Sequence, residues 1–479
     1  MTMEIFRDSL KTGDVVKSVR EGVIGDGARI PGLFGDVELT YADYVASGRA
    51  LSQVEDYVRE HVLPFYANSH TEASYCGQYI TRLRAAGRAE ISRLTNADDG
   101  CSVVFTGSGA TAGLNRLVAL FGVNKAKKAV VFIGPYEHHS NILPWRESNA
   151  TVIEVPENPE GGPNLAVLEA ALIEHQDADV KIGSFSAASN VTGVITQPDD
   201  VTRLLKKHGA LAVWDYAGGA PYLPIDMNPA PDCRKDAVVV SPHKFPGGPG
   251  ATGVLIMRDN AVVSDVPTWP GGGTVTFVSP WKHHYTSSLA SREEAGTPNV
   301  VGDIRAALAF VVKDVITQQF ISAREAEMNK MAIDAWRKNP QLVLLGTEHE
   351  NRLPIFSFLV KRKDGTRFHH QLFTRMLSDV YGIQVRGGCA CAGPYAHYLL
   401  NIDSEKSEEL FCSLQQGNEL EKPGWVRLNF SYLMSDEKVN FIIDCVNELT
   451  GRLEELEARF KADPKTARFA IDNDELEVA

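Results

Sequence analysis

The chain has 479 residues, a length that suggests two or three domains. Its formal net charge of −13 argues against nucleic acid as a partner, because binding a phosphate backbone needs a clustered positive surface. No run approaches the roughly 18 apolar residues of a membrane span, and the opening MTMEIFRDSL carries acids where a signal peptide needs basic and then apolar residues. We therefore expect a cytoplasmic protein that binds neither nucleic acid nor membranes.

The seven cysteines are sparse and odd in number, so a disulfide framework is not expected. Only Cys389 and Cys391 lie close together in the chain. Two cysteines without a second pair are a weak zinc signal, since a structural zinc ion takes four ligands. The sequence therefore predicts no metal site.

The middle of the chain alternates short β-rich runs with helix-like stretches. Several runs, such as AVVFI and AVVV, are continuously apolar, which is typical of strands buried on both faces. Strands joined by helices predict an α/β domain with a mostly parallel, seven-stranded sheet. The expected strands are 102–106, 129–134, 151–155, 180–186, 211–215, 237–241 and 252–257, and the expected helices are 110–121, 164–175 and 198–208.

The C-terminal third has the pattern of a smaller α+β domain. A single long helix is expected over 303–338, and one helix, over 50–61, is expected in the N-terminal region. The predicted domains are an N-terminal arm of 1–67 that contributes to the small domain, a large domain of 68–310 and a small domain of 311–479. The remaining expected elements are strands 352–360, 384–387 and 425–430 and helices 368–381 and 437–461.

Candidate ligand-binding residues follow the predicted strands, because ligands of parallel sheets bind beyond the carboxyl ends of the strands. The turn TGSGAT at 106–111 joins a strand to a helix, and its backbone N–H groups could bind an anion. It lacks the lysine of a P-loop, so an ordinary strand–helix turn with an N-cap is the other interpretation.

Two further strand ends carry polar residues. His138 and His139 follow one strand; adjacent histidines point apart, so a shared metal is not expected, but one imidazole could stack on a cofactor ring and carry protons. Asp215 closes another strand. It could be a metal ligand, a base, a partner for a cationic ring nitrogen, or a helix N-cap.

Lys244 lies in the glycine-flanked turn SPHKFPGG after an apolar strand. Burial lowers the pKa of a lysine, which suits Schiff-base chemistry, whereas an exposed turn lysine would be inert. Pyridoxal phosphate (PLP) needs an anion cradle for its phosphate, a lysine for its aldehyde and an acid for its ring nitrogen. These strand ends together predict a PLP site in which Lys244 forms the Schiff base.

With these residues in place, the sequence from about 82 to 446 resembles the class V branch of fold-type I PLP-dependent enzymes. Within that branch it is similar to cysteine desulfurases and selenocysteine lyases. Eight motifs carry the resemblance in the family's order: FTGSGATAGLN, EHHSNILPW, SNVTG, the aspartate of WDYAGGAP, SPHKFPGGPGATGVL, EAGTPN, VRGGCACAG and VRLNFSY. The resemblance implies a fold-type I transferase fold and a homodimer.

The resemblance also implies a role for each matching residue. Lys244 would carry the cofactor, Asp215 would pair with the ring nitrogen, and His138 would stack on the ring and carry a proton. Thr297 would reach the phosphate of the neighbouring subunit. The other implied contacts are the phosphate with Ala110, Thr111, Ser241 and His243, the ring hydroxyl and substrate with Asn190, and the substrate carboxylate with Arg386 and Arg427.

The family's nucleophilic cysteine lies five residues after the arginine, which selects Cys391 rather than Cys389. A thiolate is the nucleophile in such chemistry, whereas two inert turn cysteines are the ordinary interpretation. The sequence departs from the family pattern at Gly218, where glutamine is frequent, at Cys389, and in about twenty extra residues near 401–422.

The favoured function is a homodimeric enzyme that removes sulfur from L-cysteine through a persulfide on Cys391 and releases alanine, with a sulfur-acceptor protein as a further partner. One alternative is a class V aminotransferase or another PLP-dependent lyase acting on a different amino acid, with Cys391 idle. A non-catalytic, PLP-containing binding protein is the second alternative; the intact set of Lys244, Asp215, His138 and Arg427 argues against it. The sequence names neither the sulfur acceptor nor the pathway.

Overall fold

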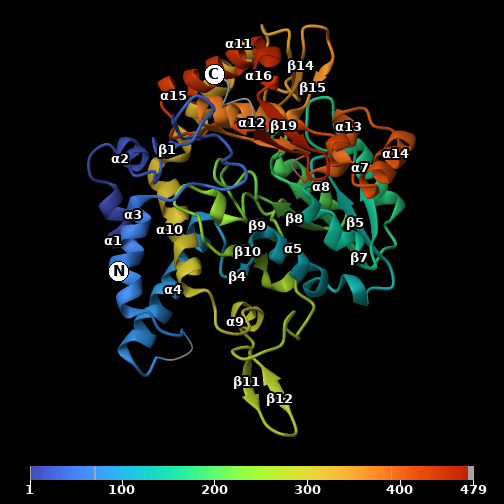
Figure 1. Cartoon of the computed structure of the whole chain (residues 1–479). Coiled ribbons are helices and arrows are strands. Elements are labelled where there is room, and N and C mark those ends of the chain that lie inside the picture. Colours follow the sequence, from blue (N-terminus) through green and yellow to red (C-terminus); the bar gives the residue numbers. More distant parts are fainter. Residues whose placement is uncertain (1, 70–71, 390, 473–479) are drawn as a thin grey trace. The chain divides into compact units, whose positions relative to one another are not determined.

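The structure is a computed structural model that describes residues 2–69, 72–389 and 391–472 (Figure 1). Contacts between Cα atoms divide the chain into two units. The predicted three-part domain division stays a prediction. The first unit comprises Met1–Ile24, Ala46–Ser189 and Ile195–Ser322, and the second comprises Gly25–Val45, Asn190–Val194 and Ala323–Ala479.

A seven-stranded sheet forms the centre of the first unit (Figure 1). Its strand order is β4-β10-β9-β8-β7-β5-β6; β10 runs antiparallel to both neighbours, and the other pairs are parallel. The predicted α/β fold class is therefore confirmed. The strands are β4 (Cys101–Gly107), β5 (Ala129–Ile133), β6 (Thr151–Glu154), β7 (Val180–Ser186), β8 (Leu211–Asp215), β9 (Ala237–Val240) and β10 (Gly253–Arg258).

Burial explains why these runs form strands. Every residue of β5, β9 and β10 is buried, as expected for strands covered by helices on both faces. The register aligns Asp215 with Ser186 on one side and with Val239 on the other, so the polar ends of β7 and β8 meet at one edge. The predicted helices following strands are present as α5 (Gly109–Leu120), α7 (Leu165–Glu174) and α8 (Pro198–Lys207).

The N-terminal region contains more helix than the sequence indicated. The helix expected over 50–61 is present as α3, which a π-helix over Val58–Val62 continues, but two further α-helices among the described residues before position 67 were not predicted. α4 packs against α10, and Gly87 permits the close approach, because a Cβ there would lie 3.0 Å from that of Ala307. The helices are α1 (Thr2–Leu10), α2 (Val15–Glu21), α3 (Ser52–Tyr57), α4 (Tyr75–Leu94) and α10 (Val300–Ile316).

Two long helices expected from the sequence are interrupted. The helix over 303–338 is divided at Thr317, which has φ +74° and whose hydroxyl accepts the N–H of Phe320 and so caps α11 (Gln318–Trp336). The helix over 437–461 is divided into α15 (Asp436–Gly451) and α16 (Leu453–Glu457), and its end forms part of a hairpin of β19 (Phe460–Asp463) with β20 (Arg468–Ile471).

The second unit contains a sheet of order β13-β14-β18-β17, with β15 paired to β14. The extra residues near 401–422 form a capped helix, α14, in which the side chain of Asp403 accepts the N–H of Lys406. The elements are β3 (Thr40–Tyr41), β13 (Leu342–Leu345), β14 (Ile355–Lys361), β15 (Arg367–Phe368), α12 (His370–Tyr381), β16 (Ile383–Gln384), β17 (Arg386–Gly388), α13 (Gly393–Leu399), α14 (Ser404–Gln415) and β18 (Trp425–Asn429).

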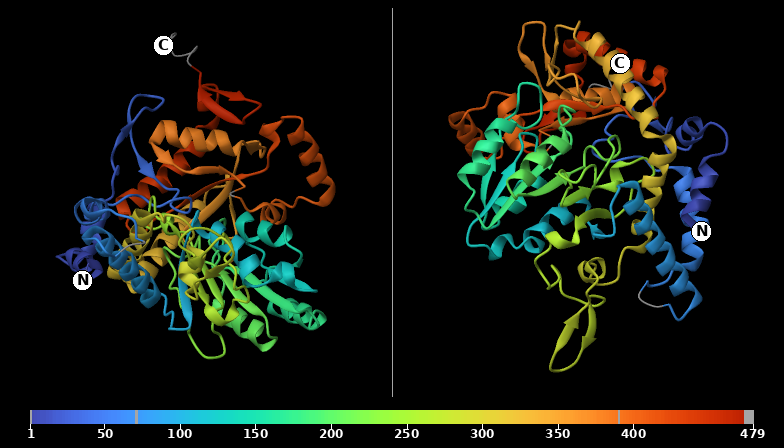
Figure 2. Two further views of the ribbon diagram at one scale, coloured as in Figure 1. Left: turned by 90° about the horizontal axis from the view of Figure 1, so that it is seen from below. Right: turned by 180° about the vertical axis from the view of Figure 1, so that it is seen from behind.

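A hairpin of β11 (Val275–Val278) and β12 (His283–Tyr285) extends from the first unit, as Figures 1 and 2 show. Its turn carries Trp281, which is 88% exposed, and Phe277 on β11 is also exposed. Among the helices of the described residues, none is both long enough and apolar enough to span a membrane.

Candidate active site

The turn between β4 and α5 in the first unit, where the sequence predicts an anion cradle, is tightly packed. Gly107 and Gly109 have φ values of +90° and +58°, which favour glycine. The N–H of Ala110 donates to the hydroxyl of Ser241 at 2.9 Å, and a Cβ at Gly109 would lie 2.9 Å from that same oxygen. The turn therefore lies directly against Ser241 at the end of β9, and glycine at position 109 permits that close approach at the start of α5.

The predicted ring-stacking histidine is joined to this cradle. The Thr111 and Ser140 hydroxyl oxygens are 2.7 Å apart, and the Ser140 N–H donates to Nδ1 of His138 at 3.1 Å. Because Nδ1 accepts that hydrogen, the neutral imidazole of His138 carries its proton on Nε2. The ring is thus held in one tautomer, with a defined proton on its other nitrogen.

Asp215 is buried at the end of β8. The N–H of Ala217 donates to its Oδ1 at 2.7 Å, and no residue of the described part of the chain donates to its Oδ2. Burial raises the pKa of the carboxyl, while the Ala217 N–H and the positive charge of Lys244 lower it. A cationic ring nitrogen would supply the missing partner, so this residue fits PLP.

Lys244 follows β9 in a short 3-10 turn and is half-buried. The turn is held by the Lys244 N–H, which donates to the Ser241 carbonyl at 3.0 Å; a Cβ at Gly248 would overlap the Pro242 carbonyl oxygen at 1.9 Å. Burial, and then the charge of Lys244, lower the pKa of His243 to about 4, so this imidazole is neutral near neutral pH.

Glu137, which sequence reasoning missed, lies beside His138 and is fully enclosed. Its carboxylate accepts the Ser186 N–H at 2.8 Å, the Ser186 hydroxyl at 2.7 Å and the Asn141 side-chain amide at 2.5 Å. Burial raises its pKa to about 7. The only sequence signal was its place in EHHSN, next to His138.

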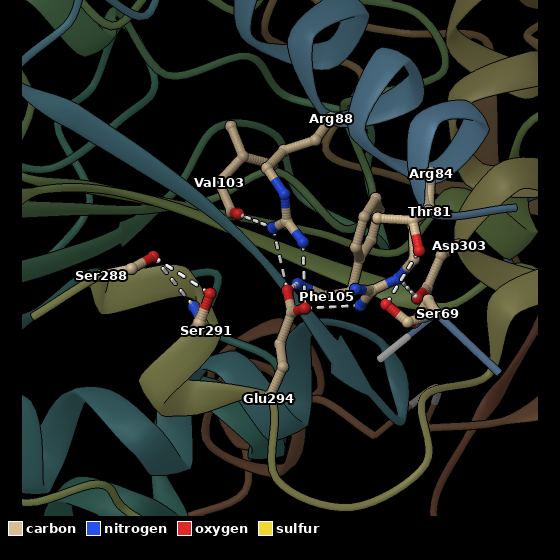
Figure 3. A network of polar contacts seen from close by, with 10 residues as sticks. All are labelled: Ser69, Thr81, Arg84, Arg88, Val103, Phe105, Ser288, Ser291, Glu294 and Asp303. Atoms are coloured by element: carbon tan, nitrogen blue, oxygen red, sulfur yellow. Dashed lines mark hydrogen bonds and ion pairs between the residues drawn. The ribbon is translucent and has the colours of Figure 1, made fainter. Parts of the chain in front are cut away.

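Thr297 is exposed in the loop between α9 (Leu289–Glu293) and α10. Its side chain makes no hydrogen bond to any of the described residues. The preceding Glu294 belongs to a charged network with Arg84, Arg88 and Asp303, shown in Figure 3. The predicted contact of Thr297 with a neighbouring subunit stays a prediction.

In the second unit, the two predicted substrate arginines lie on paired strands, with Arg386 of β17 opposite Arg427 of β18. Both bind the same carboxylate: Arg427 donates to Oδ1 of Asp43 at 2.8 Å and Arg386 to Oδ2 at 3.2 Å. The carbonyl oxygen of Asn190 accepts a second bond from Arg427 at 3.1 Å. Sequence reasoning missed Asp43, which contacts both arginines from more than 340 positions away.

Arg427 is buried, and its Nε has no hydrogen-bond partner among the described residues. Burial lowers the pKa of its guanidinium, and the charge of Asp43 opposes that effect. A buried donor without a partner is costly, and an acceptor placed at Nε would relieve that cost.

Cys391 is exposed, and its φ of +56° is uncommon for a residue other than glycine. Cys389 is half-buried, and its carbonyl oxygen accepts the Ala392 N–H at 3.2 Å. The thiol predicted as the nucleophile is thus accessible to solvent. In the described residues, His, Cys, Asp and Glu form no group of three or more suited to a metal ion.

The structure groups the candidate residues by unit. Within the first unit, hydrogen bonds link Ala110 with Ser241 and join Thr111 to the loop of His138. Within the second, Asp43 joins the two arginines. By unit, the first contains Ala110, Thr111, His138, Asp215, Ser241, His243, Lys244 and Thr297, and the second contains Asn190, Arg386, Cys391 and Arg427.

Comparison with known proteins gives consistent matches. Residues 40–440 match the family model described as aminotransferase class-V. A cysteine desulfurase of Escherichia coli O157:H7 is 30% identical over 368 residues, covering 75% of this chain and 86% of that protein. A cysteine desulfurase of Shigella flexneri is 29% identical over 366 residues, with the same coverage.

Solved structures share the fold. The apo structure of a cysteine desulfurase from Thermococcus onnurineus matches with a TM-score of 0.72 at 22% identity, covering 91% of this chain and 98% of the other. A cysteine desulfurase from Escherichia coli matches with a TM-score of 0.68 at 22% identity, covering 86% and 94%. At these identities the likeness establishes the fold alone.

Proposed function

The chain belongs to the class V aminotransferase family, and from that premise we propose that it is a PLP-dependent enzyme that removes sulfur from L-cysteine. The buried Asp215 carries this proposal. It lies at the same sheet edge as the phosphate cradle, Lys244 acts on its carboxyl electrostatically, and its Oδ2 lacks a donor among the described residues. A cationic pyridine ring meets each of these conditions.

PLP supplies an electron sink that stabilises negative charge at the α-carbon of a bound amino acid. The chain's residues would hold and orient it. The cradle and the Ser241 hydroxyl would bind the phosphate, Lys244 would hold the aldehyde carbon, and Asp215 would keep the ring nitrogen protonated. His138 has its proton on Nε2, the atom available for proton exchange once Ser140 occupies Nδ1.

The desulfuration step needs a carboxylate anchor and a thiolate. Arg427 and Arg386 would bind the substrate carboxylate, a task suited to a guanidinium because it donates two parallel hydrogen bonds. The Cys391 thiolate would attack the substrate sulfur, forming an S–S bond as the C–S bond breaks. The carbon takes the electron pair and a proton to give alanine, and the thiol becomes a persulfide.

We also propose a cytoplasmic homodimer that passes its sulfur to an acceptor protein. The exposed loop of Thr297 and the exposed apolar side chains of the nearby hairpin, among them Trp281 and Phe277, support an interface with a second copy. The seven cysteines are free, which suits a reducing compartment.

The test is to incubate the purified protein with L-cysteine and to measure sulfide, alanine and pyruvate. Sulfide and alanine in equal amounts under reductant support a desulfurase. Turnover that requires a keto acid would instead indicate an aminotransferase with Cys391 idle. No turnover of any amino acid, despite retained PLP, would favour the non-catalytic binding protein.

A further inference from the structure

The carboxylate of Glu294 lies at the centre of a charged network in the first unit (Figure 3). Its Oε1 accepts the N–H of Phe105 at 2.7 Å and a hydrogen from Arg88 at 2.9 Å. Its Oε2 accepts a second hydrogen from Arg88 at 2.9 Å and one from Arg84. Arg84 also donates to Asp303 at 2.6 Å. One carboxylate thus joins α4 to the end of β4.

This network is well shielded from water. The side chains of Glu294 and Asp303 are 7% and 1% exposed. Burial raises the pKa of the Glu294 carboxyl, but Arg88 and Arg84 outweigh this and hold the pKa below its usual value. Both guanidiniums lie over the ring of Phe105, at 4.8 and 5.3 Å from its centroid. Two cations and two anions balance, so removing one partner leaves an uncompensated buried charge.

The network adjoins two segments for which phosphate contacts are predicted, the turn at 106–111 and the loop of Thr297. Phe105 leads directly into the cradle at 106–111. Glu294 begins the exposed loop that carries Thr297, and Asp303 closes that loop at the start of α10, so Arg84 holds both ends. Any displacement of Glu294 would therefore move the cradle and the Thr297 loop together.

We propose that Glu294, held by Arg84 and Arg88, is a positioning residue that couples the two phosphate sites of a homodimer. It would position the cradle of its own subunit through Phe105 and complete the partner's site through the Thr297 loop. This inference rests on the proposed PLP-binding homodimer. It adds that one side chain acts on both sites.

Position 294 requires a carboxylate, because both oxygens of Glu294 already accept hydrogen bonds. In Glu294→Gln the side-chain NH2 must face either the Phe105 N–H or an arginine, and each arrangement brings donor against donor. We expect PLP to bind the apoenzyme about tenfold more weakly, which corresponds to roughly 1.4 kcal/mol. The measurement is an absorbance titration with PLP, which needs no turnover.

Glu90→Gln is the matched control. Glu90 lies on α4, as Arg84 and Arg88 do, and pairs with Arg7 and Arg93; among the described residues it makes no hydrogen bond to β4 or to the Thr297 loop. Its variant should bind PLP as the wild type does. If Glu294→Gln does not fold, Arg88→Lys keeps the charge but loses the two-pronged pair, and should weaken PLP binding in the same direction.

Mixed dimers separate the two roles. Lys244→Ala in one subunit leaves a single site that retains PLP after borohydride reduction. Glu294→Gln is then introduced either in the subunit that keeps Lys244 or in the other one, and retained PLP is measured against PLP concentration. In both arrangements, several-fold more PLP should be needed to reach the same amount of retained PLP as in the mixed dimer without Glu294→Gln. Weakening in only one arrangement, or in neither, would overturn the coupling. A wild-type protein that binds no PLP or stays monomeric would instead reject the proposed function before any variant is compared.

Discussion

Replacing Glu137 with glutamine should change how the stability of the protein depends on pH. The carboxyl is buried between β5 and β7 and is bonded by Ser186 and Asn141. Asn141 in turn accepts from Trp145 at 3.1 Å and from the Ser184 hydroxyl at 2.5 Å, so its amide cannot rotate without losing both bonds. The NH2 group of a glutamine would face either the Ser186 N–H or the Asn141 NH2.

The size of the effect follows from the pKa. The carboxyl titrates near 4.5 when unfolded, and burial raises its pKa to about 7 in the folded protein. Between these values the folded state binds more protons than the unfolded state, so stability is lost as the pH rises. From pH 5 to pH 8 the wild type should lose about 2 to 3 kcal/mol through this group. The amide of Glu137→Gln does not titrate between pH 5 and pH 8, so the variant should lack this loss of stability.

The assay is urea unfolding of the wild type and Glu137→Gln at pH 5 and pH 8. At pH 5 the variant should be less stable by about 1 to 3 kcal/mol, because one donor faces another. At pH 8 that deficit should vanish or reverse. Adding Asn141→Asp exchanges the amide and the carboxyl, so the glutamine NH2 faces a carboxylate and the Ser186 hydroxyl can turn to accept from that NH2; the pH dependence should then return. A deficit of equal size at both pH values would refute the reasoning.

The remaining predictions concern the proposed chemistry. Lys244→Ala should lose turnover and the PLP link that borohydride fixes; reduction onto another lysine would contradict the assignment. Asp215→Ala should reduce kcat more than PLP retention, and His138→Ala should slow the steps that transfer protons; near-wild-type rates in both would count against the site. Cys391→Ser should abolish sulfide release from L-cysteine, whereas Cys389→Ser should keep substantial activity. Mass spectrometry after brief exposure to L-cysteine should find one added sulfur on the peptide with both thiols, and full activity in Cys391→Ser would exclude its role.

The central sheet could be predicted from the sequence because several of its strands, β5, β9 and β10, are buried along their whole length. β7 and β8 begin and end at the residues expected, and β8 is apolar up to its terminal aspartate. The break at Thr317 could not be predicted in this way. The apolar pattern continues through it, and only the left-handed conformation of Thr317 and its bond to Phe320 end one helix and begin another.

The places of Asp215 and Lys244, at the end of β8 and just after β9, could be predicted from the sequence, while their roles stay predictions. The buried acids could not be predicted, because their partners lie far away in the chain. Glu294 is 210 positions from Arg84, and Asp43 is 384 positions from Arg427. A single sequence does not reveal such pairs. The motif EAGTPN singled out Thr297. Its first residue, Glu294, is the one that pairs with Arg84 and Arg88 at the start of the loop.

The net charge around Arg386 and Arg427 in the second unit is relevant to the charge of the substrate that we propose they bind. Arg386 and Arg427 contribute two positive charges, and Asp43 between them contributes one negative charge, which leaves a net charge of +1. One carboxylate balances that charge, whereas a dicarboxylate would leave an excess negative charge beside a buried guanidinium. If the pair binds the substrate carboxylate as proposed, the arrangement favours an amino acid with a neutral side chain over aspartate or glutamate. L-cysteine with its thiol protonated meets that condition, so Asp43 supports the same substrate that the position of Cys391 suggested.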